Sequence, residues 1–441
     1  MMSAEQNERI TKVGPGTPGG KLLRQYWQPA ALTEELSPER PVVTVRLLGE
    51  DLVLFRDDKG RYGLLDRRCP HRGTDLAFGR CEDGGLRCVF HGWLFDVTGQ
   101  CLQTPAEPPA SRMHTQIRQK SYPAVERNGI VFAYMGEGEP PALPDFDCFV
   151  APDRYTFAFK GLWECNWLQC QEVGIDPSHA SFLHRYFEDE SLDNTYGRPF
   201  RDASVDSDIP QSKVLREYDQ PQINIVPADT GFKLITLRPM NATQTHVRVT
   251  NMVFPNIVNL PMSQDMVLTQ YHVPVDDNNC YWYSMFTSFQ QPVDKQELRN
   301  QRLKAIDLPT YRSKFNKSNN YGFSISEQAR ETYTGMGYDI NVHDQFAVES
   351  QGSISDRTRE HLGQSDRAIS TYRRMLIDAI ARVEKGERAP WVFDATQAKR
   401  ITGPATIDGV SPADGWDQYW QEAYRKRRAA AAWNDISSAA E

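Results

Sequence analysis

The chain has 441 residues, a formal net charge of −8 and a pI near 5.7. An acidic chain of this length is expected to form two or more domains and is unsuited to general nucleic-acid binding. Its apolar runs fall short of the ~18 residues that a membrane-spanning helix requires. The polar first residues lack the apolar core of a signal peptide. The sequence therefore predicts a cytoplasmic protein with no membrane or nucleic-acid partner.

Residues 1–42 predict an irregular N-terminal arm with one short helix, at 21–27. The arm contains Gly14-Pro-Gly-Thr-Pro-Gly19, which fits the G-x-G-x-x-G spacing of dinucleotide-binding loops. No strand is expected before it, and Pro18 would disrupt the turn into a helix, so we do not interpret it as a nucleotide site.

Residues 43–147 predict an antiparallel β domain. Two apolar or β-branched runs, 43–48 and 51–55, are joined at Gly49-Glu50 as in a tight hairpin. Further strands are expected at 62–65, 86–90 and 130–134. The segment 136–152 is rich in Gly, Pro and Asp, which marks the boundary to a second domain.

Residues 148–441 predict a mixed domain in which helices back an antiparallel sheet, so that the whole chain falls in the α+β class. Strand-like runs occur at 155–164, 232–237, 245–254, 266–272 and 280–286. Helices are expected at 166–184, 366–385 and 414–428. The basic run Arg425-Lys-Arg-Arg428 is interpreted as a solvated helix face or tail.

Two Cys–His pairs lie in the predicted β domain: Cys69-Pro-His71 and, sixteen residues later, Cys88-Val-Phe-His91. In a Rieske [2Fe–2S] cluster, two thiolates bind one iron and two imidazoles bind the other, which raises the reduction potential. The alternative is a structural zinc site, whose usual spacing pairs Cys with Cys and His with His. The alternating order favours an electron-accepting cluster held by Cys69, His71, Cys88 and His91.

A second metal-binding pattern follows the domain boundary: Glu172-x3-Asp176-x2-His179-x4-His184. Two His and one carboxylate form the facial triad of oxygen-activating non-haem iron sites. A His-x4-His pair alone is more often a pair of surface or capping residues. The neighbouring carboxylates and the upstream cluster motif favour iron binding here.

The carboxylate ligand is expected further along the chain. Asp344 is the preferred candidate, Asp339 is the second choice, and His343 is a less favourable nitrogen ligand. Asp176 lies near the pair, but another role suits it better. We expect it to hydrogen-bond His179 and to form a bridge towards a cluster histidine, which makes it the candidate catalytic residue for electron transfer.

These motifs resemble those of the Rieske non-haem iron aromatic-ring-hydroxylating oxygenases over nearly the whole chain. The similarity lies in 69–73, 88–93 and 166–184, and similarity to the phthalate dioxygenase-like oxygenases built from α subunits alone lies in 5–11, 14–18 and 356–366. The resemblance implies an all-β Rieske domain, a helix-grip catalytic domain, a [2Fe–2S] cluster and a mononuclear Fe(II). Its iron ligands would be His179, His184 and Asp344.

The resemblance also implies a head-to-tail homotrimer or hexamer, in which Asp176 couples the cluster of one subunit to the iron of the next. A separate NAD(P)H-dependent reductase, with flavin or an iron–sulfur centre, would supply electrons. The activity would be hydroxylation of an aromatic substrate with O2, as a dioxygenase similar to phthalate dioxygenase. One alternative is a monooxygenase that removes a methyl group from a methoxylated aromatic acid. An alternative of another class is a Rieske electron carrier without oxygenase activity.

Two cations on neighbouring predicted strands, Lys233 and Arg248, are candidates for binding the substrate. Either could pair with a carboxylate or sulfonate on the aromatic ring, and a guanidinium does so through two parallel hydrogen bonds. The alternative is that both side chains face solvent. The sequence therefore favours an anionic aromatic substrate without identifying it.

Overall fold

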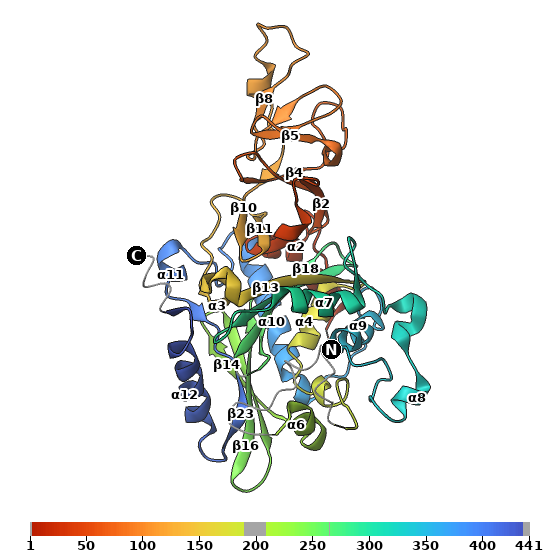
Figure 1. Ribbon diagram of the computed structural model, residues 1–441, viewed down its shortest axis with the longest axis vertical. Helices are drawn as coiled ribbons and strands as arrows, with labels where there is room; N and C mark the ends of the chain where they lie inside the picture. The colour runs from red at the N-terminus through yellow and green to blue at the C-terminus, as the bar shows by residue number, and fades with distance from the viewer. Residues whose placement is uncertain (1, 189–208, 264, 435–441) are drawn as a thin grey trace.

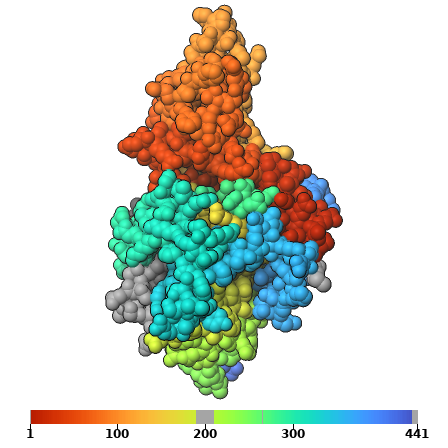
Figure 2. All heavy atoms as spheres, turned by 90° about the vertical axis from the view of Figure 1, so that its right-hand side faces the viewer, coloured from red at the N-terminus to blue at the C-terminus, as the bar shows by residue number. Residues whose placement is uncertain are grey.

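The computed structural model describes residues 2–188, 209–263 and 265–434 (Figure 1). Strands β4, β5 and β8 lie at one end of the long axis, and β16, β23 and α6 lie towards the other. Figure 2 shows the N-terminal β domain as a narrow projection above a broader body. The expected α+β architecture is confirmed, with an all-β domain followed by an antiparallel sheet with helices.

Two small antiparallel sheets form the projection. Their strand orders are β2-β3-β4-β9 and β5-β6-β7-β8. The strands are β2 (Val42–Leu47), β3 (Glu50–Arg56), β4 (Tyr62–Asp66), β5 (Arg80–Glu82), β6 (Gly85–Arg87), β7 (Leu94–Phe95), β8 (Cys101–Gln103) and β9 (Ser121–Tyr122). The β2–β3 turn is Leu48-Gly49 and not the expected Gly49-Glu50. Both turn residues have positive φ, of 49° and 77°, which suits the tight turn of a two-residue hairpin.

The first 42 residues differ from the expected irregular arm. They form α1 (Ala4–Thr11), α2 (Pro18–Leu23) and β1 (Trp27–Leu32), and β1 pairs with β11 (Ile130–Tyr134), which also pairs with β10 (Ala124–Arg127). The short helix begins earlier than 21 because Thr17 caps it and Pro18 occupies its first turn. Both helices pack on α10 (Arg367–Glu384), so this segment ties the β domain to the catalytic body.

One large sheet forms the centre of the catalytic body. Among the described residues it has ten strands, in the order β14-β15-β16-β17-β18-β19-β13-β21-β20, with β23 paired to β16. They are β13 (Thr156–Trp163), β14 (Gln222–Ala228), β15 (Gly231–Pro239), β16 (Gln244–Val253), β17 (Ile257–Pro261), β18 (Met266–Pro274), β19 (Cys280–Ser288), β20 (Ile306–Asp307), β21 (Arg312–Ser313) and β23 (Ile407–Pro412). Alternate residues of its central strands face the cavity described below.

Helices cover this sheet and carry the site. Helix α4 (Trp167–Gly174) packs on β17, β18 and β19 and against α9 (Ile340–Glu349). The helix expected at 166–184 instead ends at Gly174, because Pro177 lacks the N–H that a continued helix requires. The remaining helices include α3 (Asp147–Val150), α6 (Gln211–Glu217), α7 (Lys295–Ala305), α8 (Ile325–Gln328), α11 (Ala395–Ala398) and α12 (Trp416–Ala429). Within the described ranges, the chain contains no helix both long and apolar enough to span a membrane.

The basic run at the end of α12 is only half of the solvated face that the sequence predicts, because Arg425 and Lys426 are exposed but Arg427 and Arg428 are not. Arg427 is buried, and its Nη2 donates to the carbonyl oxygen of Thr406 at 2.7 Å while its guanidinium lies over the ring of Phe289. Arg428 forms an ion pair with Asp147 at 3.2 Å. A long basic side chain can bury its aliphatic stem when its charged end reaches a hydrogen-bond acceptor. The contacts of Arg427 and Arg428 therefore hold α12 against the rest of the catalytic body.

Candidate iron centres and substrate cavity

Two matching loops carry the four candidate cluster ligands. In the first loop, Gly73 N–H donates to the carbonyl oxygen of Cys69 at 2.8 Å. In the second, Gly92 N–H donates to the carbonyl oxygen of Cys88 at 3.0 Å. Gly73 and Gly92 have φ of 75° and 74°, a region that glycine adopts without steric cost. The same glycine-closed turn therefore presents one Cys and one His in each loop.

The side chains of these loops form one cluster. Cys69 and Cys88 are each 2% exposed, and the ring centroids of His71 and His91 lie 4.4 Å apart. The ring of Trp93 stacks on His71 at the same centroid distance. Burial raises the pKa of the Cys69 thiol to about 12, and the neighbouring Cys88 thiol adds to this effect. A coordinated iron would replace the thiol protons, so a pair of adjacent thiols and a pair of adjacent imidazoles fit a Rieske cluster.

The spacing of these residues distinguishes a two-iron cluster from a single zinc ion. With metal–ligand bonds of 2.0–2.3 Å, the ligand atoms of a tetrahedral zinc site lie within about 4 Å of one another. In the part of the chain that the structure describes, no three of these four residues bring their ligand atoms within 4.8 Å of one another. The arrangement therefore favours the wider cluster over zinc.

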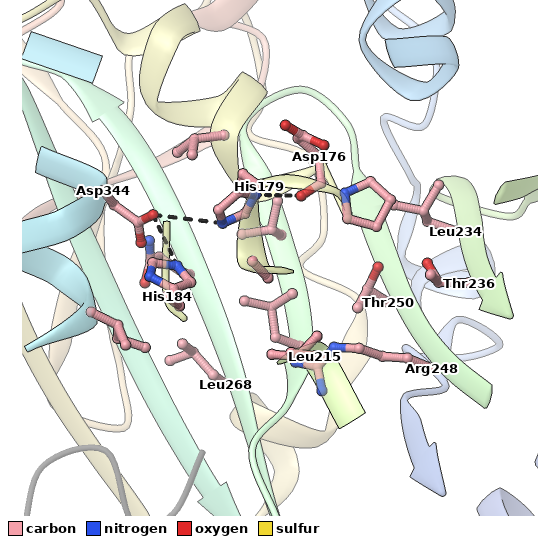
Figure 3. Close-up of a pocket in the computed structure, with 18 of the residues that line it drawn as sticks. Asp176, His179, His184, Leu215, Leu234, Thr236, Arg248, Thr250, Leu268 and Asp344 are labelled. Carbon is pink, nitrogen blue, oxygen red and sulfur yellow. Dashed lines mark hydrogen bonds and ion pairs between the residues drawn. The ribbon is translucent and has the colours of Figure 1, made fainter. Parts of the chain in front are cut away.

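His179, His184 and Asp344 come together in the catalytic body, as Figure 3 shows. Their ligand atoms all lie within 4.8 Å of one another. Asp344 Oδ1 is 3.6 Å from His179 Nε2 and 3.3 Å from His184 Nε2. Two imidazoles and one carboxylate in this arrangement fit the facial triad of a non-haem iron.

The two other candidates for the third iron ligand have different partners. Asp339 caps the N-terminus of α9 and pairs with Arg302 at 3.1 Å. His343 lies behind His184 and faces it through Nδ1 at 3.3 Å. The structure therefore brings Asp344, and neither alternative, to the centre of the group.

The environment of Asp344 suits a cation. Its Oδ1 is buried and has no hydrogen-bond donor. Burial raises the pKa of this carboxyl to about 6, although the nearby His179 opposes the shift. A buried carboxylate without a donor is costly unless a positive charge compensates it. A ferrous ion between the two imidazoles and this oxygen would supply that charge.

A backbone carbonyl fixes the orientation of the His179 imidazole. His179 Nδ1 contacts the carbonyl oxygen of Asp176, and because a carbonyl can only accept, this nitrogen carries the proton. The carboxylate of Asp176 instead accepts from the N–H of Ser178 at 2.8 Å. The expected contact between Asp176 and His179 is therefore made by the backbone, and it leaves His179 Nε2 to face the metal position.

His184 is oriented through a second histidine that the sequence suggested only as a ligand. His343 Nε2 lies 2.9 Å from the carbonyl oxygen of Gly337, so this nitrogen carries the proton of the neutral ring. Burial lowers the pKa of His343 to about 4, which keeps the ring neutral near pH 7. Its Nδ1 then accepts from His184 Nδ1–H, and His184 Nε2 faces Asp344. No sequence spacing indicates this role.

A cavity of about 150 Å³ adjoins the triad. Its apolar wall includes Leu215, Leu234 and Leu268, which suits an aromatic ring. In Figure 3, Thr236, Thr250 and Arg248 lie across the cavity from Asp344. The cavity therefore has an iron end and a polar end, separated by aliphatic side chains.

The structure brings only one of the two predicted substrate-binding cations to this cavity. Arg248 lines it, but its guanidinium contacts Asp408, which also lies 3.0 Å from His246 Nε2. Lys233 lines a different, open pocket beside Asp229, because successive residues of a strand point to opposite faces. Lys233 is therefore excluded from the cavity by strand parity.

Arg238, which sequence analysis missed, also lines the cavity. It is 1% exposed, and its Nη2 donates to the carbonyl oxygen of Pro177 at 3.1 Å. Its Nε and Nη1 have no hydrogen-bond partner among the described residues. Burial lowers the pKa of Arg238 to about 10, and the charge of Arg248 contributes. The signal was available in the strand period, since Arg238 shares a face with Leu234 and Thr236.

Comparisons with known proteins agree with this geometry. The Rieske [2Fe-2S] domain family matches residues 26–123, and the family described as LigXa C-terminal domain like matches residues 133–431. The chain is 33% identical to the 5,5'-dehydrodivanillate O-demethylase oxygenase subunit of a Sphingobium species, covering 93% of this chain and 89% of that protein. It is also 33% identical to the phthalate 4,5-dioxygenase oxygenase subunit of Pseudomonas putida, covering 95% of each.

Solved structures give the same fold. A crystal structure of dicamba monooxygenase bound to dicamba covers 83% of this chain and 99% of its own, with a TM-score of 0.55 and 19% identity. Fold and site together define an oxygen-activating iron oxidoreductase. The chain belongs to the Rieske non-haem iron oxygenases and is an oxygenase subunit that uses a [2Fe–2S] cluster and a mononuclear iron. The electron-carrier alternative does not account for this membership, which extends over both domains.

Proposed function

We propose that this oxygenase subunit hydroxylates an anionic aromatic substrate bound between the iron triad and Arg238. In this proposal the cluster ligands are Cys69, His71, Cys88 and His91, and the iron ligands are His179, His184 and Asp344. The observation that carries the substrate class is the buried guanidinium of Arg238, which has two nitrogens without partners. A substrate carboxylate would offer two oxygens to these donors.

Charge balance supports the choice of Arg238. An uncompensated buried charge costs several kcal/mol, about 3–5 when one member of a buried pair is removed. Arg248 already contacts Asp408, so its charge is largely balanced within the protein. The Arg238 charge has no such carboxylate contact among the described residues. An anionic substrate would therefore gain most at Arg238, with Arg248 adding to the local positive field.

The residues around the cavity would bind the substrate and orient the metal ligands. When bound, the cluster supplies electrons and the mononuclear iron supplies the site of O2 activation. Arg238 would hold the acid group, and Leu215, Leu234 and Leu268 would orient the ring and exclude water. The carbonyl oxygen of Asp176 and the ring of His343 would keep the Nδ1 protons of the two histidine ligands in place.

The electron path requires partners. Val89 and Phe90 are 54% and 53% exposed beside the cluster loops, and Arg72 lies over the Phe90 ring at 5.4 Å. This exposed tip supports docking of a separate NAD(P)H-dependent reductase or of another subunit.

The cluster loops belong to the projection, whereas α9 lies in the catalytic body (Figure 1). That separation supports a head-to-tail homotrimer or hexamer in which Asp176 receives electrons from a neighbouring subunit. None of the eight cysteines, all within the described residues, forms a disulfide, which supports a reducing, cytoplasmic setting.

O-demethylation is the second candidate, because one relative of 33% identity is an O-demethylase oxygenase subunit. The two reactions would use the same triad and cavity and would differ in which substrate carbon lies at the iron. Formaldehyde release from a methoxylated aromatic acid would identify demethylation. A hydroxylated ring without formaldehyde would identify ring hydroxylation.

Ligand binding tests the proposed substrate class. Anaerobic calorimetry on the holoenzyme should show binding of benzoate or phthalate and much weaker binding of the uncharged methyl esters. Arg238→Met should weaken acid binding by about 10- to 100-fold, as expected for lost charged hydrogen bonds. Lys233→Met, on the opposite face of the same strand, is the matched control and should bind as the wild type does. Equal affinity for acids and esters would contradict the proposal.

A further inference from the structure

Another polar side chain, Gln270, lines the cavity at a distance from the arginines. It stands opposite Val258 on β17, which stands opposite Met252 on β16. Arg238 on β15 stands opposite His246, which is six residues along β16 from Met252. Three strand spacings and six residues separate the Cα atoms of Gln270 and Arg238 by roughly 24 Å along a flat sheet. The cavity therefore has polar groups at two well-separated positions.

A chain of hydrogen bonds fixes the direction of the Gln270 amide, starting outside the cavity. The carbonyl oxygen of Ile257 accepts from Gln171 Nε2 at 3.2 Å. Because a carbonyl can only accept, Gln171 turns its Oε1 towards His272 Nδ1, which lies 2.8 Å away. An amide oxygen also can only accept. The proton of the neutral His272 ring is therefore on Nδ1.

The remaining links follow from this tautomer. His272 is fully buried, and burial lowers its pKa to about 3, so its Nε2 acts as an acceptor near pH 7. Gln270 Nε2 lies 3.0 Å from His272 Nε2 and must donate to it. Gln270 Oε1 is then the atom that accepts from Ser284 Oγ, at 3.1 Å. Both ends of the Gln270 amide are thereby assigned.

One hydrogen of Gln270 remains. An amide nitrogen carries two hydrogens, and His272 accepts only one of them. No acceptor for the second is found among the described residues, although the side chain lines the cavity. A polar group inside a mostly apolar cavity is stable when a ligand or water accepts its hydrogen. Gln270 Nε2 therefore has a fixed orientation and one N–H that is available to a ligand or water in the cavity.

We propose that Gln270 is a specificity-determining residue that donates its second N–H to an oxygen substituent on the aromatic ring, away from the acid group. The inference rests on the proposed function, since it takes the acid group to be bound by Arg238. The residue would select an ether, hydroxyl or carboxyl oxygen over an alkyl group. With both ends of the substrate held, it would also determine which part of the substrate lies at the iron. His272 and Gln171 would act as positioning residues.

Matched ligands test this role. The probes are 3- and 4-methoxybenzoate and their near-isosteres 3- and 4-ethylbenzoate, in which a methylene replaces the ether oxygen. Anaerobic calorimetry on the holoenzyme should show a preference for the methoxy member of at least one pair, by about 5- to 10-fold, as one hydrogen bond gives. Gln270→Met keeps the side-chain length and removes the donor, so the preference should fall to about onefold. Gln296→Met, at an exposed position on α7, should retain it.

The positioning residues give a further readout. Gln171 does not line the cavity, yet Gln171→Met should reduce the methoxy-to-ethyl ratio by releasing the His272 tautomer. A merely structural defect would weaken both ligands alike and leave the ratio unchanged. Equal affinity of the wild type for both members of each pair, or an unchanged preference in Gln270→Met, would overturn the role of Gln270. If the wild type binds none of the four acids, the proposed substrate class itself is wrong.

Discussion

The two iron centres of this protein are built in opposite ways. All four cluster candidates fall within residues 69–91, on two loops that repeat one glycine-closed turn. The mononuclear site takes His179 and His184 from one loop but Asp344 from α9, about 160 residues further along. The first site is assembled by local backbone geometry, and the second depends on the packing of α4 against α9. A substitution that disrupts the catalytic body should therefore remove the mononuclear iron and leave the cluster bound.

The largest expected effect is the loss of one centre without the other. Asp344→Ala removes the carboxylate of the triad, so iron should fall from about three to about two atoms per chain. Activity should fall more than about 100-fold, since losing even an outer hydrogen-bond partner of a metal ligand costs 10–100-fold. The visible spectrum of the cluster should persist. Asp339→Ala is the matched control and should keep all of its iron. If Asp339→Ala loses the mononuclear iron and Asp344→Ala keeps it, the third ligand is Asp339.

A buried ion network around Glu172 should make the stability of the catalytic body sensitive to acid. Burial alone would raise the pKa of Glu172, but Arg357 and Arg373, at 2.8 and 2.6 Å, lower it below its usual range. Such a group stabilises the fold above its unfolded pKa, near 4.3, and the stabilisation is lost as pH falls through the lower folded value.

Glu172→Gln should therefore destabilise the protein by about 3–5 kcal/mol at pH 7, because buried Arg357 loses its carboxylate partner and Arg373 keeps only Glu360. Thermal unfolding followed by far-UV circular dichroism measures this change. The difference from the wild type should shrink as pH falls below about 4. A difference that stays constant with pH would exclude the carboxylate charge as its source.

His343 should affect only the mononuclear site. His343→Phe retains a flat ring but removes the acceptor that orients His184. Affinity for ferrous iron should fall about 10- to 100-fold, as expected when the partner of a metal-binding histidine is lost. Competition with a chelator measures this affinity, and cluster content should not change. An unchanged affinity for iron would contradict the proposal that His343 orients His184.

The smallest effect concerns the link between the centres. Asp176→Asn keeps the backbone carbonyl that faces His179, so both metals should remain bound. Removal of the carboxylate charge should slow reoxidation of the reduced cluster, by about 10-fold at the lower end of such effects. Stopped-flow absorbance with substrate and O2 follows this step. Reoxidation at the wild-type rate would leave the residue without a role in electron transfer.

The sequence predicts those features of the fold and site that depend on residues close together in the chain. The Cys–His loops, the His-x4-His pair and most strands are local, and Asp344 was the preferred partner among three candidates. The helix expected at 166–184 is too long, because α4 stops at Gly174 and Pro177 lacks the N–H that a longer helix requires. Lys233 was misplaced because parity along β15 depends on the register of the strand. His343 and Gln270 act through contacts between distant segments, which no spacing in the sequence encodes. Arg238 differs, because the strand period already places it on the face of Leu234 and Thr236.

Iron and acid-labile sulfide analysis of the anaerobic holoprotein, together with electron paramagnetic resonance of its reduced form, tests the central claim most directly. We predict about three iron atoms and about two sulfides per chain, with a Rieske-type signal. A single iron without sulfide, or a zinc content that replaces the cluster iron, would contradict the presence of two iron centres in this chain.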